Sequence, residues 1–200
     1  MAFLKGFGTG LAMIVFLGPV FFTLLKTTLN NGLKGGMLVA AGIIASDILC
    51  VLLCSFGAIP FFKNPENQLW LGIAGFVLLS ALGLKYLFKP SVYAENENAA
   101  PSGNAAAFFA KGFIVNFVNP FVFLVWIGVI GFARMKYGLT WELAVFLFAA
   151  LLAIFTTDTL KVVFAHRIKS LLKPEYLRNT YRVIGIVLII FGVRMLWKVL

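Results

Sequence analysis

Hydrophobic residues make up 62% of the 200-residue chain, and charged residues only 12%. A water-soluble domain is roughly half apolar and about a quarter charged, so this composition excludes a soluble globular fold and predicts a protein whose solvent is lipid. The net charge of +10 does not predict nucleic-acid binding, because the Lys and Arg residues lie mainly in short segments between apolar stretches, where they would meet lipid headgroups.

Six apolar stretches follow one another along the chain, each long enough to cross a bilayer as a helix. Turn residues and charged residues separate them, and the longest polar connection, near mid-chain, has the composition of a flexible linker. The predicted membrane helices are residues 6–25, 36–58, 69–88, 112–133, 141–164 and 181–199.

The two halves of the chain resemble each other at three places, which occur in the same order in each half. The matched pairs are Pro19 with Pro120, Asp47 with Asp158 and Gly83 with Gly192, at offsets of 101, 111 and 109 residues. Each half holds three spans, an odd number, so the second half must enter the membrane in the opposite orientation to the first. Inverted repeats of this kind recur in secondary transporters, although duplication alone is also compatible with a channel or a membrane enzyme.

The predicted fold class is therefore all-α, a polytopic membrane protein with six transmembrane helices built as two inverted three-helix repeats. We expect the first repeat at residues 1–89, a flexible polar linker at 90–110 and the second, inverted repeat at 111–200. In such folds the substrate site lies near the middle of the membrane, between the repeats.

A proline occurs at matching places in the first and fourth spans, as Gly18-Pro19 and Asn119-Pro120. Proline removes a backbone donor and clashes with the preceding turn, so we expect both helices to kink or break there. The half-helix ends that a break exposes can hold charged groups of a ligand. We interpret the duplicated pair as part of a substrate-binding site; the alternative is a kink with only a structural role.

Two asparagines, Asn116 and Asn119, lie three residues apart in the fourth span. This spacing predicts that both side chains lie on one helix face. A buried amide without a partner costs about 1–3 kcal/mol, so we expect them to bind substrate or to join helices, and both interpretations stay open.

Asp47 and Asp158 are the only acids deep inside the predicted spans. Acids within a membrane typically mark ion or proton paths. Lys161, three residues after Asp158, is placed to pair with it on one helix face. Asp47 has no such neighbour, and removal from water favours its neutral form, so we predict that it carries a proton. The alternative is a structural group in which Lys161 serves both acids.

The remaining polar and aromatic residues indicate no further chemistry. Cys50 and Cys54 are interpreted as small buried hydrophobic residues. The tryptophans are expected mostly at the membrane interface, and they are Trp70, Trp126, Trp141 and Trp197. No nucleophile-base set, phosphate loop or metal-spaced His/Cys cluster occurs in the sequence, so we expect no cofactor, no resident metal and no enzymatic activity.

Three motifs, "FLGPVFF", "GIIASDILCVLL" and "KGFIVNFVNPFVFLVW", resemble first-, second- and fourth-span motifs of the lysine exporter (LysE/RhtB) family of bacterial amino-acid efflux carriers. The resemblance covers essentially the whole chain. It implies a secondary transporter that exports amino acids or related small metabolites across the inner (cytoplasmic) membrane, coupled to protons or to membrane potential. Carried over by position, the family-motif residues are Gly18, Pro19, Asp47, Asn116, Asn119 and Pro120.

One departure from the family pattern leaves the substrate open, since Phe16-Leu17 stand where members often carry Thr-Pro or Pro-Pro. A divalent-metal exporter of the same superfamily is therefore one alternative, and a membrane scaffold that transports nothing is a second, from a different class of protein. The expected partners are a small-molecule substrate and the lipid bilayer; a homo-oligomer is compatible with the sequence, and nucleic acid is not expected.

Overall fold

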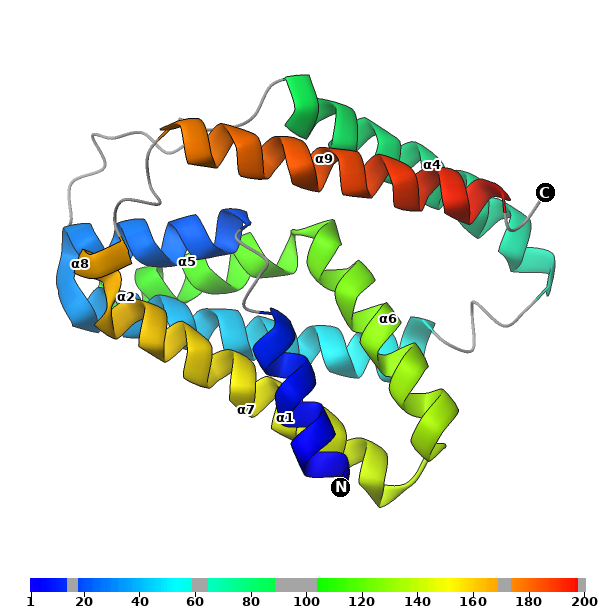
Figure 1. Ribbon diagram of the computed structural model, residues 1–200, viewed down its shortest axis with the longest axis horizontal. Coiled ribbons are helices and arrows are strands. Elements are labelled where there is room, and N and C mark those ends of the chain that lie inside the picture. Colours follow the sequence, from blue (N-terminus) through cyan, green and yellow to red (C-terminus); the bar gives the residue numbers. More distant parts are fainter. Residues whose placement is uncertain (14–17, 59–64, 89–103, 169–173, 198–200) are drawn as a thin grey trace. The chain divides into compact units, whose positions relative to one another are not determined.

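The computed structural model describes residues 1–13, 18–58, 65–88, 104–168 and 174–197, and across these residues the chain forms helices and no strand (Figure 1). The all-α prediction is thereby confirmed for the described part of the chain. In chain order the elements are α1 (Ala2–Ala12), α2 (Pro19–Leu53), the π-helix η2 (Cys54–Ala58), α4 (Pro65–Phe88), α5 (Ala105–Phe117), α6 (Pro120–Tyr137), α7 (Trp141–Val163), α8 (Ala165–Ile168) and α9 (Pro174–Trp197).

Three helical stretches of the described residues are long and apolar enough to cross a membrane, and they are Pro19–Phe56, Pro120–Tyr137 and Trp141–Val163. The first of these bends sharply at Gly32, whose φ of 74° and ψ of −177° suit only glycine. As a result α2 consists of two segments, 19–31 and 33–53, and the chain turns back between them (Figure 1). This turn falls between the first two predicted spans.

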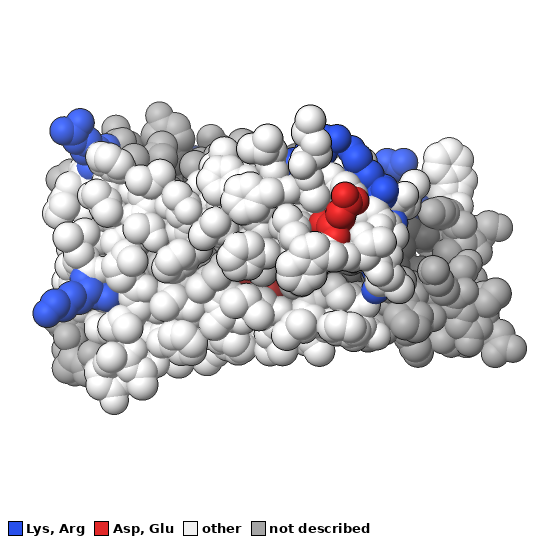
Figure 2. Space-filling model, turned by 90° about the horizontal axis from the view of Figure 1, so that it is seen from below, with Lys and Arg blue, Asp and Glu red and all other residues white. Residues whose placement is uncertain are grey.

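The surface of the protein is largely apolar. On the face shown in Figure 2, uncharged side chains cover most of the described surface, and charged groups occur in a few small clusters. Large hydrophobic side chains are exposed on several helices, including Phe132 on α6, Phe148 on α7 and Ile190 on α9. An exposed apolar surface of this kind fits contact with lipid tails.

The chain divides into two compact units, one formed by Met1–Ser55 with Pro101–Ser170 and the other by Phe56–Ala100 with Leu171–Leu200. In the second unit α4 and α9 cross at Gly83 and Gly185, where a Cβ added to either would lie 2.6 Å from the carbonyl oxygen of the other. Small residues thus let the two backbones approach closely.

Most of the predicted linker at 90–110 lies outside the described residues. Its last residues are helical, because α5 begins at Ala105. Asn104 supplies the N-cap, with its Oδ1 accepting a hydrogen bond from the Ala107 N–H at 2.9 Å. The division of the chain into two three-helix repeats stays a prediction.

In the first unit, α5 packs on α2 and α1 packs on α7 (Figure 1). Both crossings depend on glycine. A Cβ at Gly42 would collide with the Phe109 carbonyl group, and one at Gly112 with the Val39 carbonyl group. On the other crossing, a Cβ at Gly10 would collide with the carbonyl group of Ala150. These close approaches bring polar side chains of α5 within reach of α2.

Candidate functional site

Both prolines mark a break in a helix, as predicted. In the first span α1 ends at Ala12 and α2 begins at Pro19, with Gly18 as its N-cap. In the fourth span α5 ends at Phe117 and α6 begins at Pro120. Proline suits the first position of a helix, where its missing N–H has no helical acceptor to lose. Each break therefore presents the N-terminus of a new half-helix inside an apolar segment.

Asn119 caps α6. Its Oδ1 accepts a hydrogen bond from the Phe121 N–H at 3.1 Å, and its own N–H donates to the Asn116 carbonyl oxygen at 3.2 Å. Asn116 and Asn119 do not lie on one continuous helix, as the sequence predicted, because α5 ends at Phe117 and Asn119 is the N-cap of α6. Asn116 belongs to the last turn of α5, and Asn119 lies in the connection.

The two breaks differ in the residue that precedes the proline. Gly18 has no side chain to cap α2, so the first N–H groups of that helix depend on other partners. Helix N-termini carry partial positive charge and favour anionic groups.

Asp47 of α2 is held by the two helices that flank the second break. Its Oδ1 accepts hydrogen bonds from Asn116 Nδ2 at 2.9 Å and from Trp126 Nε1 at 3.0 Å. Asn116 Nδ2 also lies 3.2 Å from Ser46 Oγ. Asp47 is only 4% exposed and Asn116 3%, so the network lies in the interior of the unit. Asp47 thus has neutral donors rather than a cation as its described partners.

From the sequence, Trp126 is grouped with the other tryptophans as a candidate for the membrane interface and is not connected with Asp47. The side chain is 1% exposed and donates to Asp47 from the middle of α6. Its position well inside the predicted span 112–133, rather than at an end, was the signal available in the sequence. A buried indole N–H needs a hydrogen-bond partner, which Asp47 supplies.

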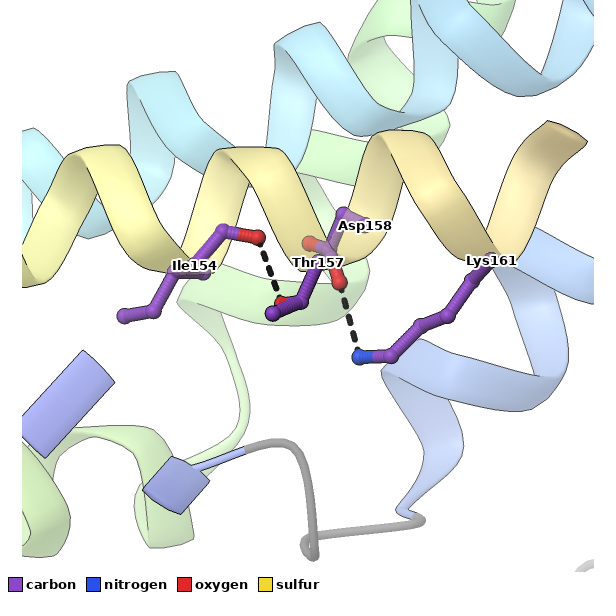
Figure 3. A network of polar contacts seen from close by, with 4 residues as sticks. All are labelled: Ile154, Thr157, Asp158 and Lys161. Atoms are coloured by element: carbon purple, nitrogen blue, oxygen red, sulfur yellow. Dashed lines mark hydrogen bonds and ion pairs between the residues drawn. The ribbon is translucent and has the colours of Figure 1, made fainter. Parts of the chain in front are cut away.

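Asp158 and Lys161 form the predicted ion pair on α7, with Lys161 Nζ 2.9 Å from Asp158 Oδ1 (Figure 3). The neighbouring Thr157 hydroxyl donates to the Ile154 carbonyl oxygen of the same helix and stays outside the pair. Lys161 Nζ also lies 5.8 Å from the centroid of the Phe21 ring, within range of a cation–π interaction. Among the described contacts, the ion-pair partner of Lys161 is therefore Asp158 and not Asp47.

The charge of Asp158 acts on Asp47, but more weakly than burial and the hydrogen bonds from Trp126 and Asn116 do. The partners of the two acids differ: a cation on the same helix for Asp158, and two neutral donors from other helices for Asp47. Among the described residues, no group of three or more His, Cys, Asp or Glu side chains is placed to hold a metal ion.

Replacement of Asp158 by Asn should reduce the yield of folded protein. The change leaves the Lys161 ammonium in a largely buried place without its counter-ion, which costs about 3 kcal/mol for a buried pair. The double variant Asp158→Asn/Lys161→Met removes both charges and should restore the yield. Membrane yield and thermal unfolding in detergent would measure both effects, and an equally poor double variant would contradict this explanation.

Several apolar helices of spanning length, two of them interrupted before a proline, define a multi-pass membrane protein with two buried carboxylates. The model of the family described as LysE type translocator matches residues 11–199, and the chain belongs to that family. It is also 25% identical over 196 residues to "Putative amino acid efflux protein YcgF" of Bacillus subtilis (strain 168), an alignment that covers 95% of this chain and 92% of the relative. No solved structure matches the chain significantly.

Proposed function

We propose that this translocator is a secondary carrier that exports amino acids or related small metabolites across the bacterial cytoplasmic membrane, coupled to protons or to membrane potential. The observation that carries the proposal is the buried Asp47 carboxylate, which is bonded from both sides of a helix break. The family and the name of the Bacillus relative support the class of substrate. Because the sequence contains no phosphate-loop motif for a nucleotide, we assign the driving force to a gradient.

The architecture we propose is the six-span inverted repeat, with residues 1–89 and 111–200 as its halves. Matching helices make matching contacts, which supports it. Gly10 of α1 approaches the Ala150 carbonyl group, and Gly112 of α5 approaches that of Val39. Gly10 and Gly112 are 102 residues apart, close to the offset of the prolines, and Val39 and Ala150 are 111 apart, as are the aspartates.

The proposed substrate site lies at the two helix breaks. There the half-helix N-termini at Pro19 and Pro120 would attract the carboxylate of an amino acid. Gly18 carries no side chain that could cap the first N–H groups of α2, and Asn119 fixes the start of α6. Asn116 would act indirectly, since its amide is already bonded to Asp47.

The proposed coupling group consists of Asp47, Asp158 and Lys161. The ion pair on α7 stays charged through the cycle, because each member neutralises the other. Asp47 is neutralised by a proton instead, which it gains from the outside and loses to the cytoplasm. Each cycle would then move a proton inward as substrate moves outward.

Efflux from preloaded proteoliposomes tests this function. Purified protein should release labelled amino acids faster than protein-free vesicles do, and an imposed inward proton gradient should increase the rate. A panel of neutral, cationic and anionic amino acids would define the substrate class. Absence of flux for every amino acid, with folded protein in the vesicles, would overturn the proposal. The metal-exporter and scaffold alternatives have no specific support among the described residues.

A further inference from the structure

One oxygen atom connects α2 to both halves of the broken fourth span. Asp47 Oδ1 accepts from Asn116, in the last turn of α5, and from Trp126, two turns into α6. The break at Val118 and Asn119 lies between the two donors. A change in the angle between α5 and α6 must therefore stretch at least one of these bonds or move Asp47.

Both bonds depend on the charge of Asp47. The indole N–H of Trp126 can only donate, and Asn116 donates through its amide nitrogen. A hydrogen bond to a carboxylate is roughly twice as strong as one between neutral groups. A proton on the Asp47 carboxyl group removes the negative charge and weakens both bonds together. Asn116 Nδ2 keeps its contacts with Ser46 Oγ at 3.2 Å and the Ile43 carbonyl oxygen at 3.4 Å, so the connection that loosens most is the one between α2 and α6.

The surroundings of Asp47 contain few other groups that could dominate this effect. Asp158 of α7 acts on it through its charge, and Lys161 holds Asp158. On α2 itself the nearest titratable side chain is the buried thiol of Cys50, one turn further on. The other charged groups on α2 and on the elements that pack against it lie at least five residues along the chain from Asp47, Asn116, Trp126 and Asp158. They are Lys26 and Lys34 on α2, Lys111 on α5, Arg134 and Lys136 on α6, Glu142 on α7, and His166 and Arg167 on α8.

We propose that Trp126 is a positioning residue that forms, with Asn116 and Asp47, a proton-sensitive latch on the fourth-span break. Charged Asp47 holds α5 and α6 at one angle, and protonated Asp47 releases α6 while α5 stays packed on α2. The latch rests on the proposed function for its role in transport, where it would link proton binding to movement of the half-helix that begins at Pro120. Its existence can be measured without any substrate.

A single-tryptophan protein reports on the latch directly, because indole fluorescence responds to the loss of a hydrogen bond to a charged group. The variant keeps Trp126 and carries the changes Trp70→Phe, Trp141→Phe and Trp197→Phe. Its emission should change through one transition as pH is lowered, and the transition should disappear when Asp47→Asn is added. An emission that does not vary with pH, or the same transition without Asp47, would overturn the latch.

Transport by Trp126→Phe gives a second, independent measurement. This change keeps an aromatic ring and removes the N–H donor. The stimulation of efflux by an imposed proton gradient should therefore fall by roughly tenfold, the size expected for one hydrogen bond to a charged group. Downhill exchange should continue. Trp141→Phe is the matched control, because Trp141 is 80% exposed, and it should retain full stimulation. Equal stimulation in the two variants would contradict a positioning role for Trp126.

The two proposals can fail separately. A fluorescence transition that depends on Asp47, in a protein that moves no amino acid, supports the latch and overturns the proposed substrate class. Gradient-driven amino-acid efflux by a protein whose Trp126 emission does not vary with pH supports the proposed function and overturns the latch.

Discussion

Asp47→Asn should abolish proton-driven accumulation of substrate, with the ratio of uphill to downhill flux falling by at least about tenfold, because the amide cannot bind and release a proton within the membrane. Asparagine has nearly the shape of aspartate, and its side-chain oxygen can still accept from Asn116 and Trp126. The fold and some downhill exchange should therefore persist. Efflux from proteoliposomes, measured with and without an imposed pH step, gives both quantities.

The matched control is Glu142→Gln, the same acid-to-amide change at an exposed position in the first turn of α7. This variant should transport as the parent protein does. Full proton coupling in Asp47→Asn would show that Asp47 serves packing alone, and the coupling mechanism would then be wrong. A variant that has lost downhill exchange as well as coupling would instead place Asp47 in substrate binding.

Gly42→Leu should prevent the first unit from packing correctly. A Cβ at this position collides with the backbone of Phe109 and Phe113, which no change of side-chain rotamer can relieve. We expect a loss of at least about 2 kcal/mol, since overpacking against flexible side chains alone costs 1–3 kcal/mol. Displacement of α5 would also carry Asn116 away from Asp47. Thermal unfolding and the yield of monodisperse protein in detergent would measure the effect.

Gly128→Leu on α6 is the matched control, because nothing lies within 4 Å of a Cβ built there. Leucine favours helix over glycine by roughly 0.8 kcal/mol, so this variant should be as stable as the parent or slightly more so. Similar losses in both variants would mean that leucine at any glycine of these helices is harmful, and that the crossing of α2 and α5 has no special role.

Local features could be predicted from the sequence because each depends on residues that are close together in the chain. The breaks before Pro19 and Pro120 follow from the missing N–H and the fixed φ of proline. The pair of Asp158 and Lys161 follows from a spacing of three residues on one helix. The apolar composition likewise determined that the protein is helical and lies in a membrane.

The partners of Asp47 were decided only by the tertiary structure. Asn116 and Trp126 lie 69 and 79 residues further along the chain, and no local spacing relates them to Asp47. They meet it because Gly42 and Gly112 let α5 cross α2 at close range, and because the break turns α6 back toward the same carboxylate. The same break separates Asn119 from Asn116, which the sequence alone placed on one helix face. Contacts between helices depend on how closely their backbones approach each other. The order of residue types along the chain does not specify the distance between two packed helices.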